Sequence, residues 1–159
     1  MLFADWYVRF RPLLAAGLIV LSGETDIAID ATDEALVRAF ERWERVETLS
    51  SPEAWTYRVG ANVVRRKMRR RSVERRLWRR AEPAPQAPDL NPHVWIAVKS
   101  LPRRQREAIA LRYLMGMSEM EVASTLGIAV GTASATLSMA RSKLARLLAD
   151  EVHTEVDRA

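Results

Sequence analysis

The residues with the most evident binding chemistry lie between positions 53 and 80, where eleven basic side chains accompany only two acidic ones. Aromatic residues lead this segment, and polar residues follow at helical spacing: Trp55, Tyr57, Arg58, Asn62, Arg65, Arg66, Arg69 and Arg70. Arg58, Arg65 and Arg69 fall on one face of a helix. Rings that stack on unpaired bases, followed by arginines that hold phosphates, are typical of a platform for single-stranded nucleic acid. The alternative is a solvated charged face with both aromatic rings in the core.

A second group of polar side chains is predicted to lie on a helix-turn-helix between positions 118 and 148. Ser118 and Glu121 have the spacing of a capping box, small Ala123 lets two helices approach, and Gly127 supplies the turn. The second helix would bury Val130, Leu137, Leu144, Leu147 and Leu148. Its outer face would carry Thr132, Ser134, Ala135, Thr136, Ser138, Arg141 and Lys143. An ordinary antiparallel helix pair is the alternative.

Catalytic chemistry finds little support in the remaining polar residues. His93 and His153 have no companions at ligand spacing, and the sequence shows no glycine-rich phosphate loop or nucleophile motif. Cysteine is absent, which excludes thiolate catalysis, disulfides and cysteine-type zinc sites. We therefore expect neither an enzyme nor a bound metal or cofactor.

The elements that must position these residues are all predicted to be helices. The first covers Phe3 to about Leu21, and Thr25 is expected to cap the second. Apolar residues recur at helical spacing through "ATDEALVRAFERW". Ser51 is expected to cap the long basic helix, with Pro52 in its first position, where a missing N–H costs nothing.

One segment supplies all the positive excess of a chain whose net charge is +5. Residues 1–52 carry a net charge of −4, residues 53–80 carry +9, and residues 81–159 are neutral overall. A concentrated basic stripe is the electrostatic signature of a polyanionic partner, most often nucleic acid.

A proline-rich segment divides the chain into two parts. "EPAPQAPDLNP", residues 82–92, has four prolines, which stop helices and favour a semi-rigid spacer. The sequence therefore predicts an all-α protein with two small helical domains, residues 1–81 and 93–150. The second domain would begin with the short helix "HVWIAVKS", and another helix would restart at Pro102 before the helix-turn-helix.

Nothing in the sequence indicates export or membrane insertion. The apolar run "LLAAGLIVL" has nine residues, too few to cross a bilayer, and it lacks the features of a signal peptide. Together with the missing cysteines, this favours the cytoplasm.

The order of these parts resembles an extracytoplasmic-function sigma factor of bacterial RNA polymerase. "DATDEALVRAFERW" (residues 30–43) is similar to the second-helix motif of sigma region 2. "SPEAWTYRVGANVVRRKMRRR" (residues 51–71) looks like the helix of that region that meets the −10 element. Residues 101–144 resemble region 4, which binds the −35 element in the family. The resemblance covers nearly the whole chain apart from the linker and the tail.

The resemblance implies contact surfaces for core RNA polymerase and promoter DNA, without bond chemistry. The polymerase clamp would be bound by Asp33, Glu34, Val37, Arg38, Glu41 and Arg42. Flipped −10 bases would lie beside the loop at about Val46 to Ser51, with Trp55, Tyr57, Arg58 and Asn62 behind it. Arg65, Arg66, Arg69 and Arg70 would clamp phosphates. The family often has an anti-sigma partner as well.

The predicted recognition helix departs from the family pattern. Relatives commonly show basic residues here, as in "VGTVKSRLSRA", whereas this chain has "VGTASATLSMA". Phosphate anchoring would therefore fall to Arg103, Arg104, Arg141 and Lys143, with Thr132, Ser134, Ala135, Thr136 and Ser138 facing the bases. Since hydroxyl groups read bases less strongly than a bidentate arginine, we predict weak or shape-led −35 recognition. "DATDE" also lacks the usual glutamine before the glutamate.

Two other functions stay open at this point. A helix-turn-helix regulator could bind duplex DNA by itself, but it would not need the segment from residue 30 to 71. A degenerate sigma-like adaptor could bind polymerase or an anti-sigma protein without reading DNA. The uncharged recognition helix favours the adaptor, and the charge of residues 53–80 argues against it.

Overall fold

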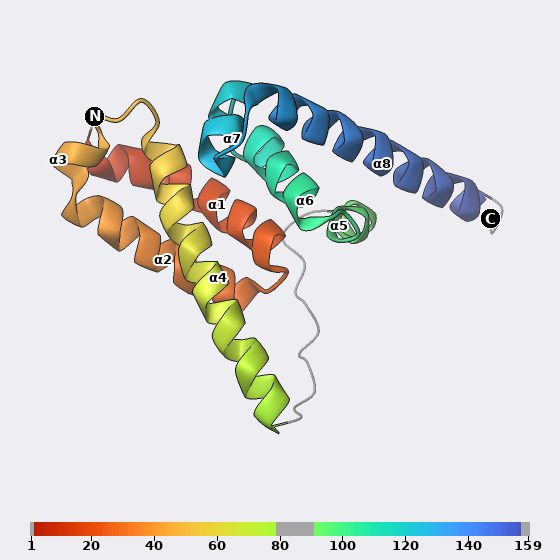
Figure 1. The fold of residues 1–159 in the computed structure, drawn as a ribbon, viewed down its shortest axis with the longest axis horizontal. Helices are drawn as coiled ribbons and strands as arrows, with labels where there is room; N and C mark the ends of the chain where they lie inside the picture. The colour runs from red at the N-terminus through yellow and green to blue at the C-terminus, as the bar shows by residue number, and fades with distance from the viewer. Residues whose placement is uncertain (1, 79–90, 157–159) are drawn as a thin grey trace. The chain divides into compact units, whose positions relative to one another are not determined.

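The computed structural model describes residues 2–78 and 91–156, with side chains described for 2–74 and 91–149. Every regular element in these ranges is helical, and the chain forms two compact units, Met1–Gln86 and Ala87–Ala159 (Figure 1). The prediction of an all-α fold with two helical parts is confirmed. Most of the predicted linker, residues 82–90, and the predicted end of the first domain lie outside the described residues.

The first unit is built on three long helices that pack against one another. Its elements are α1 (Phe3–Ser22), α2 (Thr25–Glu41), the short α3 (Trp43–Val46) and α4 (Pro52–Trp78). In Figure 1, α4 runs across the pair formed by α1 and α2. Trp6, Leu14, Leu18, Tyr57 and Val64 are almost completely buried between them. This core fixes α4, and therefore its basic residues, against α2.

Gly60 allows the close approach of α4 to α1 and α2. A Cβ atom at this position would lie 2.7 Å from Leu18 Cδ1 and 3.5 Å from Ala35 Cβ. Leu18 is itself fully buried, so its side chain has little room to retreat. The position therefore needs a residue without a side chain.

The ends of α2 and α4 test two predicted caps. The Ser51 hydroxyl accepts a hydrogen bond from the Ala54 N–H at 3.1 Å, and α4 begins at Pro52, which confirms the first cap. The second prediction is wrong: α2 begins at Thr25 itself, and Glu24 is its N-cap residue. The helix starts one residue earlier than the side-chain pattern suggested.

Aromatic rings tie the start of α1 to the end of α2. The Phe3 ring lies 5.0 Å from that of Phe40 and 5.2 Å from that of Trp43, measured between centroids. Trp6 and Trp43 are 4.8 Å apart, and the Trp6 indole N–H donates to a Glu53 carboxylate oxygen at 2.7 Å. This contact connects the cluster to the first turn of α4.

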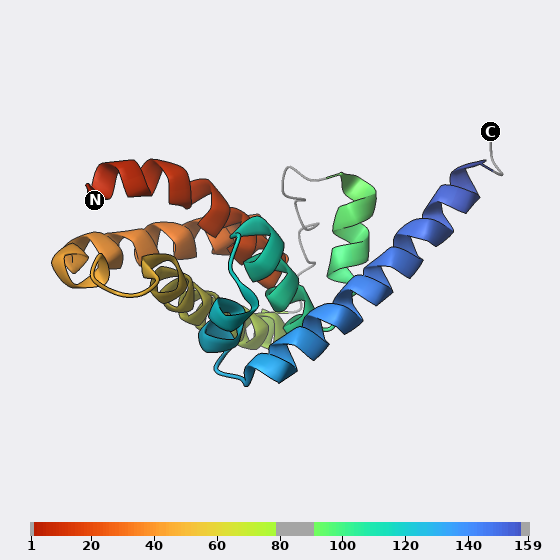
Figure 2. The same ribbon diagram turned by 90° about the horizontal axis from the view of Figure 1, so that it is seen from above.

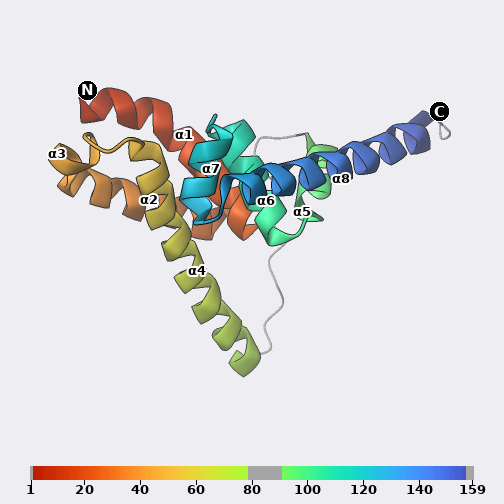
Figure 3. The ribbon, with the colours of Figure 1, turned by 45° about the horizontal axis from the view of Figure 1, so that its top comes forward.

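The second unit contains the helix-turn-helix. Its elements are α5 (Pro92–Lys99), α6 (Arg103–Ile109), the π-helical turn η1 (Ala110–Leu114), α7 (Glu119–Leu126) and α8 (Val130–Val156). Figure 2 shows α5 beside α8, and Figure 3 shows α6 and α7 gathered at the start of α8. Leu111, Val122, Ala133, Leu137 and Ala140 form the buried core where these helices meet. The single helix predicted from Pro102 is thus an α-helix that continues through a π turn.

The predicted capping box and the predicted glycine turn are both present between α6 and α8. The Ser118 hydroxyl accepts from the Glu121 N–H, and the Glu121 carboxylate accepts from the Ser118 N–H, which completes the capping box. Gly127 has φ of 66°, a left-handed conformation that glycine adopts without steric cost. The predicted buried stripe holds at Leu137 and is only partly buried at Leu144, Leu147 and Leu148. It fails at Val130, the first residue of α8, which is 49% exposed.

Candidate nucleic-acid interface

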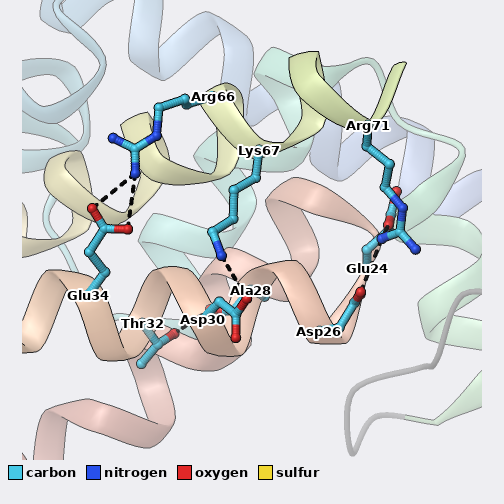
Figure 4. Close-up of polar contacts among 9 residues, drawn as sticks. All are labelled: Glu24, Asp26, Ala28, Asp30, Thr32, Glu34, Arg66, Lys67 and Arg71. Carbon is cyan, nitrogen blue, oxygen red and sulfur yellow. Dashed lines mark hydrogen bonds and ion pairs between the residues drawn. The ribbon is translucent and has the colours of Figure 1, made fainter. Parts of the chain in front are cut away.

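The basic residues of α4 lie on two different sides of the helix. The inner side faces α2, where Arg66, Lys67 and Arg71 bond to carboxylates (Figure 4). The outer side is solvent-exposed at Arg58, Asn62 and Arg69, which are spaced four and seven residues apart and so share one face. Arg70 is also exposed, whereas Arg65 is partly buried and donates to the Asn62 side-chain oxygen at 2.7 Å.

Several ion pairs join the inner side of α4 to α2. Arg66 Nη2 donates to both Glu34 carboxylate oxygens, at 3.0 and 3.1 Å, and Lys67 Nζ lies 2.6 Å from an Asp30 oxygen. Arg71 bonds to Glu24 and to Asp26 (Figure 4). The net charges of −4 and +9 assigned to the two segments are therefore partly neutralised within the unit. Among the described residues, no ion pair involves Arg58, Arg69 or Arg70.

The two aromatic residues predicted to stack on bases have different environments. Trp55 is partly exposed in the first turn of α4, so part of its ring is open to solvent. Tyr57 is only 1% exposed and belongs to the core, so a base cannot reach its ring in this structure. The predicted base contact of Tyr57 is therefore wrong here, and the sequence alternative of a core aromatic holds at that position.

The residues predicted to bind polymerase lie along α2 and at its end. Asp33, Val37, Glu41 and Arg42 are exposed. Glu34 also accepts a hydrogen bond from Arg38 at 2.6 Å, in addition to the contact with Arg66. Four of the six predicted side chains are thus exposed, and three of the six are held in ion pairs: Glu34, Arg38 and exposed Asp33, which lies 3.2 Å from Arg11 Nη2.

Sequence reasoning missed an exposed aromatic residue on the same surface. The Phe40 side chain is 63% exposed and follows Val37 by one turn on the exposed side of α2. The available signal was an apolar residue at a position outside the buried stripe of α2. The helical spacing of the apolar residues alone placed Phe40 with the core.

The outer face of α8 carries the side chains predicted to meet a −35 element. Thr132, Ala135, Ser138 and Arg141 are exposed, and Ser134, Thr136 and Lys143 are partly buried. The Thr136 hydroxyl donates to the Thr132 carbonyl at 2.7 Å, so it serves the helix backbone. Lys143 Nζ lies 3.2 Å from the Ser100 carbonyl oxygen. The exposed set is dominated by hydroxyl and methyl groups.

The predicted phosphate anchors of this unit are only partly free. Arg103 and Arg104 are exposed at the start of α6, and Arg104 donates to the Leu126 carbonyl at 3.4 Å. Arg141 donates to the Tyr113 hydroxyl at 3.4 Å, and this bond is the main reason that the pKa of its guanidinium is raised. The Ser134 hydroxyl donates a hydrogen bond to the carboxylate of Glu119. The sequence patterns did not indicate Glu119 as a site residue.

The described part of the chain has no cluster of metal-ligating side chains. No group of three or more histidine, aspartate or glutamate side chains there could hold a metal ion. No single described helix is long and apolar enough to cross a membrane, although α7 and the first part of α8 pass that test together as a pair bent by 105°.

Comparison with known proteins assigns both units. Residues 6–74 match the family model for Sigma-70 region 2, and residues 97–144 match that for Sigma-70 region 4. The chain is 35% identical over 144 residues to the ECF RNA polymerase sigma factor EcfG of Rhodopseudomonas palustris strain TIE-1, covering 86% of this chain and 80% of that one. The chain belongs to the ECF RNA polymerase sigma factors. This sigma factor therefore directs transcription initiation, as the resemblance of its sequence motifs implied.

Further relatives agree with this assignment. The sigma factor is 31% identical over 158 residues to the RNA polymerase sigma-E factor of Streptomyces coelicolor, covering 95% of this chain and 87% of the relative. Its fold matches RpoE of Bartonella quintana, solved with the anti-sigma factor NepR, with a TM-score of 0.76, 30% identity and coverage of 92% and 96%. CnrH, solved with the cytosolic domain of CnrY, matches with a TM-score of 0.64, 25% identity and coverage of 93% and 88%.

Proposed function

We propose that this sigma factor binds core RNA polymerase through the exposed face of α2 and holds the −10 strand on the outer face of α4. In this proposal α8 contacts the −35 element weakly, and the polymerase supplies all bond chemistry. The compartment is then the cytoplasm, where polymerase and promoter meet. Residues 1–81 would act as the polymerase and −10 module, and residues 93–150 as the −35 module.

The main support for the proposal is that the basic residues of α4 form two groups, one paired with carboxylates and one exposed to solvent. Arg66, Lys67 and Arg71 neutralise carboxylates of α2, whereas Arg58, Arg69 and Arg70 point to solvent and can meet phosphates. Partly exposed Trp55 lies in the first turn of the same helix, where a ring can stack on a flipped base. Extruding a base costs a few kcal/mol, so stacking and phosphate contacts must act together.

The exposed face of α2 has the mixed character of a protein-binding surface. Val37 and Phe40 are 55% and 63% exposed, and charged Asp33, Glu41 and Arg42 surround them. An apolar centre with a charged rim is the usual composition of a specific interface. This supports a protein partner for α2 in place of an ordinary solvated face.

The composition of α8 supports a minor role in promoter affinity. Its outer face offers Thr132, Ala135 and Ser138, with Arg141 as the exposed cation of the predicted set. Bidentate contacts from arginine to guanine give roughly 1–3 kcal/mol of discrimination, and hydroxyl groups give less. Region 2 would therefore supply most of the affinity for DNA.

An anti-sigma protein is a further proposed partner. Two solved relatives, RpoE and CnrH, have structures with an anti-sigma factor and with the cytosolic domain of CnrY, respectively. An anti-sigma protein that covered the exposed apolar residues of α2 would block the proposed polymerase surface.

Reconstituted transcription tests the proposed function. The chain would be mixed with core polymerase and a promoter library, and initiation would be compared with that of Arg65→Ala plus Arg69→Ala. We expect this double variant to lose initiation while still binding core polymerase. Arg9→Ala plus Arg45→Ala is the matched control, because it removes the same charge from exposed positions on α1 and α3.

The same experiment separates the rival functions. Polymerase binding without initiation by the unaltered chain would favour the adaptor. Tight, sequence-specific binding to duplex DNA without polymerase would favour an independent helix-turn-helix regulator. Equal activity of the arginine double variant and its control would refute the role of α4.

A further inference from the structure

Glu119 is the first residue of α7 and contacts the predicted recognition helix. Its carboxylate accepts the hydroxyl hydrogen of Ser134, which lies one turn into α8. Glu119 and Ser134 are both partly buried, so the bond lies at the junction between the two helices. The hydroxyl that would otherwise be available to DNA at this position is thus already engaged.

The carboxylate also acts on the next polar residue along the same flank of α8. Arg141 follows Ser134 by seven residues, or about two helical turns, so the two side chains point the same way. The pKa of Arg141 is raised chiefly by the hydroxyl of Tyr113, and the negative charge of Glu119 adds to the effect. Glu119 is therefore one of the charges that act on a cation that could meet a phosphate.

The sequence that forms the turn and the first turns of α8 carries no charge of its own. From Val122 to Ala140 the chain has no charged side chain. The electrostatic potential over the first turns of α8 is consequently set by groups that flank it, of which Glu119 contributes negative charge. A DNA duplex carries one negative charge per about 1.7 Å of its axis and would be repelled there.

We propose that Glu119 is a specificity determinant that lowers the sequence-independent affinity of the helix-turn-helix for duplex DNA. It repels phosphates from the first turns of α8 and withholds the Ser134 hydroxyl from them. Promoter choice then depends more strongly on region 2. This inference rests on the proposed function in assigning α8 to DNA, but it concerns a residue outside the predicted contact set.

Duplex binding by the full chain provides the test. Fluorescence anisotropy would measure the affinity of the unaltered chain and of Glu119→Gln for a labelled 25-base-pair duplex without promoter sequence. Because the change removes one repelling charge, we expect binding about three- to tenfold tighter at low salt, and a log–log salt slope steeper by up to roughly one. Glu44→Gln, at an exposed position on α3, makes the same change in net charge and should alter affinity less than twofold.

A purely structural role of Glu119 predicts the opposite sign. A carboxylate in the first turn of a helix favours the helix dipole, so the glutamine variant should melt no higher than the unaltered chain. A gain in DNA affinity therefore cannot come from a more stable fold. We further expect that Ser134→Ala changes little in the unaltered chain but removes part of the gain in the Glu119→Gln background.

The outcomes decide the proposal. Unchanged or weaker binding by Glu119→Gln, or a gain that Glu44→Gln matches, would overturn it. Transcription with core polymerase reports separately on the proposed function: if the unaltered chain fails to initiate, that function falls, while the duplex comparison still decides the role of Glu119.

Discussion

Replacement of Gly60 by alanine probes the packing that positions the basic helix. The added Cβ would lie 2.7 Å from Leu18 Cδ1 and 3.4 Å from its Cδ2, and Leu18 is fully buried. Overpacking of this kind costs about 1–3 kcal/mol. Alanine in place of glycine within a helix recovers roughly 0.5–1 kcal/mol. We therefore expect Gly60→Ala to destabilise the first unit by a net amount of about 1 kcal/mol.

Urea unfolding followed by tryptophan fluorescence measures this change, since Trp6 and Trp43 report on the first unit. Gly131→Ala is the matched control, because a Cβ on Gly131 in α8 meets no atom within 4 Å. The control should be as stable as the unaltered chain or slightly more stable. Adding Leu18→Val to Gly60→Ala removes one carbon where one was added, and should cost less than the sum of the two single changes.

A Gly60→Ala chain as stable as the Gly131→Ala control would refute the reasoning. That result would mean that α4 can move away from α1 and α2 without loss of free energy. The basic face of α4 would then have no fixed position relative to α2. Strictly additive effects of the changes at Gly60 and Leu18 would likewise show that the two positions do not share one contact.

Three further predictions follow from individual contacts. Leu137→Ala should lower the stability of the second unit by about 2–5 kcal/mol in urea unfolding, because this side chain is fully buried, and a loss below about 1 kcal/mol would contradict its core position. Ser118→Ala should cost about 1 kcal/mol at neutral pH. The hydrogen bonds from the Ser118 backbone and hydroxyl lower the pKa of Glu121, so the stability from this carboxylate is present above its ordinary pKa of about 4.3 and is lost as the pH falls through the lower folded value. The difference in melting temperature between Ser118→Ala and the unaltered chain should therefore narrow as the pH falls, because protonation removes the benefit of the bond from the Ser118 hydroxyl to the Glu121 carboxylate while the bond from the Glu121 N–H to that hydroxyl remains. A difference that does not change with pH would argue against the bond between hydroxyl and carboxylate. Arg69→Ala should weaken binding of the polymerase complex to a bubble template more than Arg66→Ala does, as read by anisotropy, because a carboxylate of α2 already holds Arg66; equal losses would show that this ion pair opens on DNA.

Local signals predicted the helices and their ends well. The capping box at Ser118, the turn at Gly127 and the Ser51 cap before Pro52 depend on residues within a few positions of one another, and the structure has all three. The Thr25 cap failed because a threonine can occupy either the cap or the first helical position, and local sequence does not distinguish them.

Sequence patterns could not predict the features that depend on packing between residues far apart in the sequence. Tyr57 was placed with the base contacts because it precedes the arginines, but its side chain is buried in the core of the first unit. The pairing of Arg66 with Glu34 joins residues 32 positions apart, and only the packing of α4 on α2 brings them together. Glu119 was overlooked for the same reason, since its partner Ser134 lies on the next helix.

The ion pair between Glu34 and Arg66 has a consequence for how this protein can diverge. The carboxylate belongs to the proposed polymerase surface, and the guanidinium was predicted to meet the promoter. A substitution at Glu34 would leave the Arg66 guanidinium without its carboxylate, and a substitution of Arg66 selected for a new promoter would leave Glu34 bonded to Arg38 alone, at the proposed polymerase surface. Lineages of this protein are therefore expected to exchange the two positions together, so that a change in promoter preference carries a compensating change at the polymerase contact.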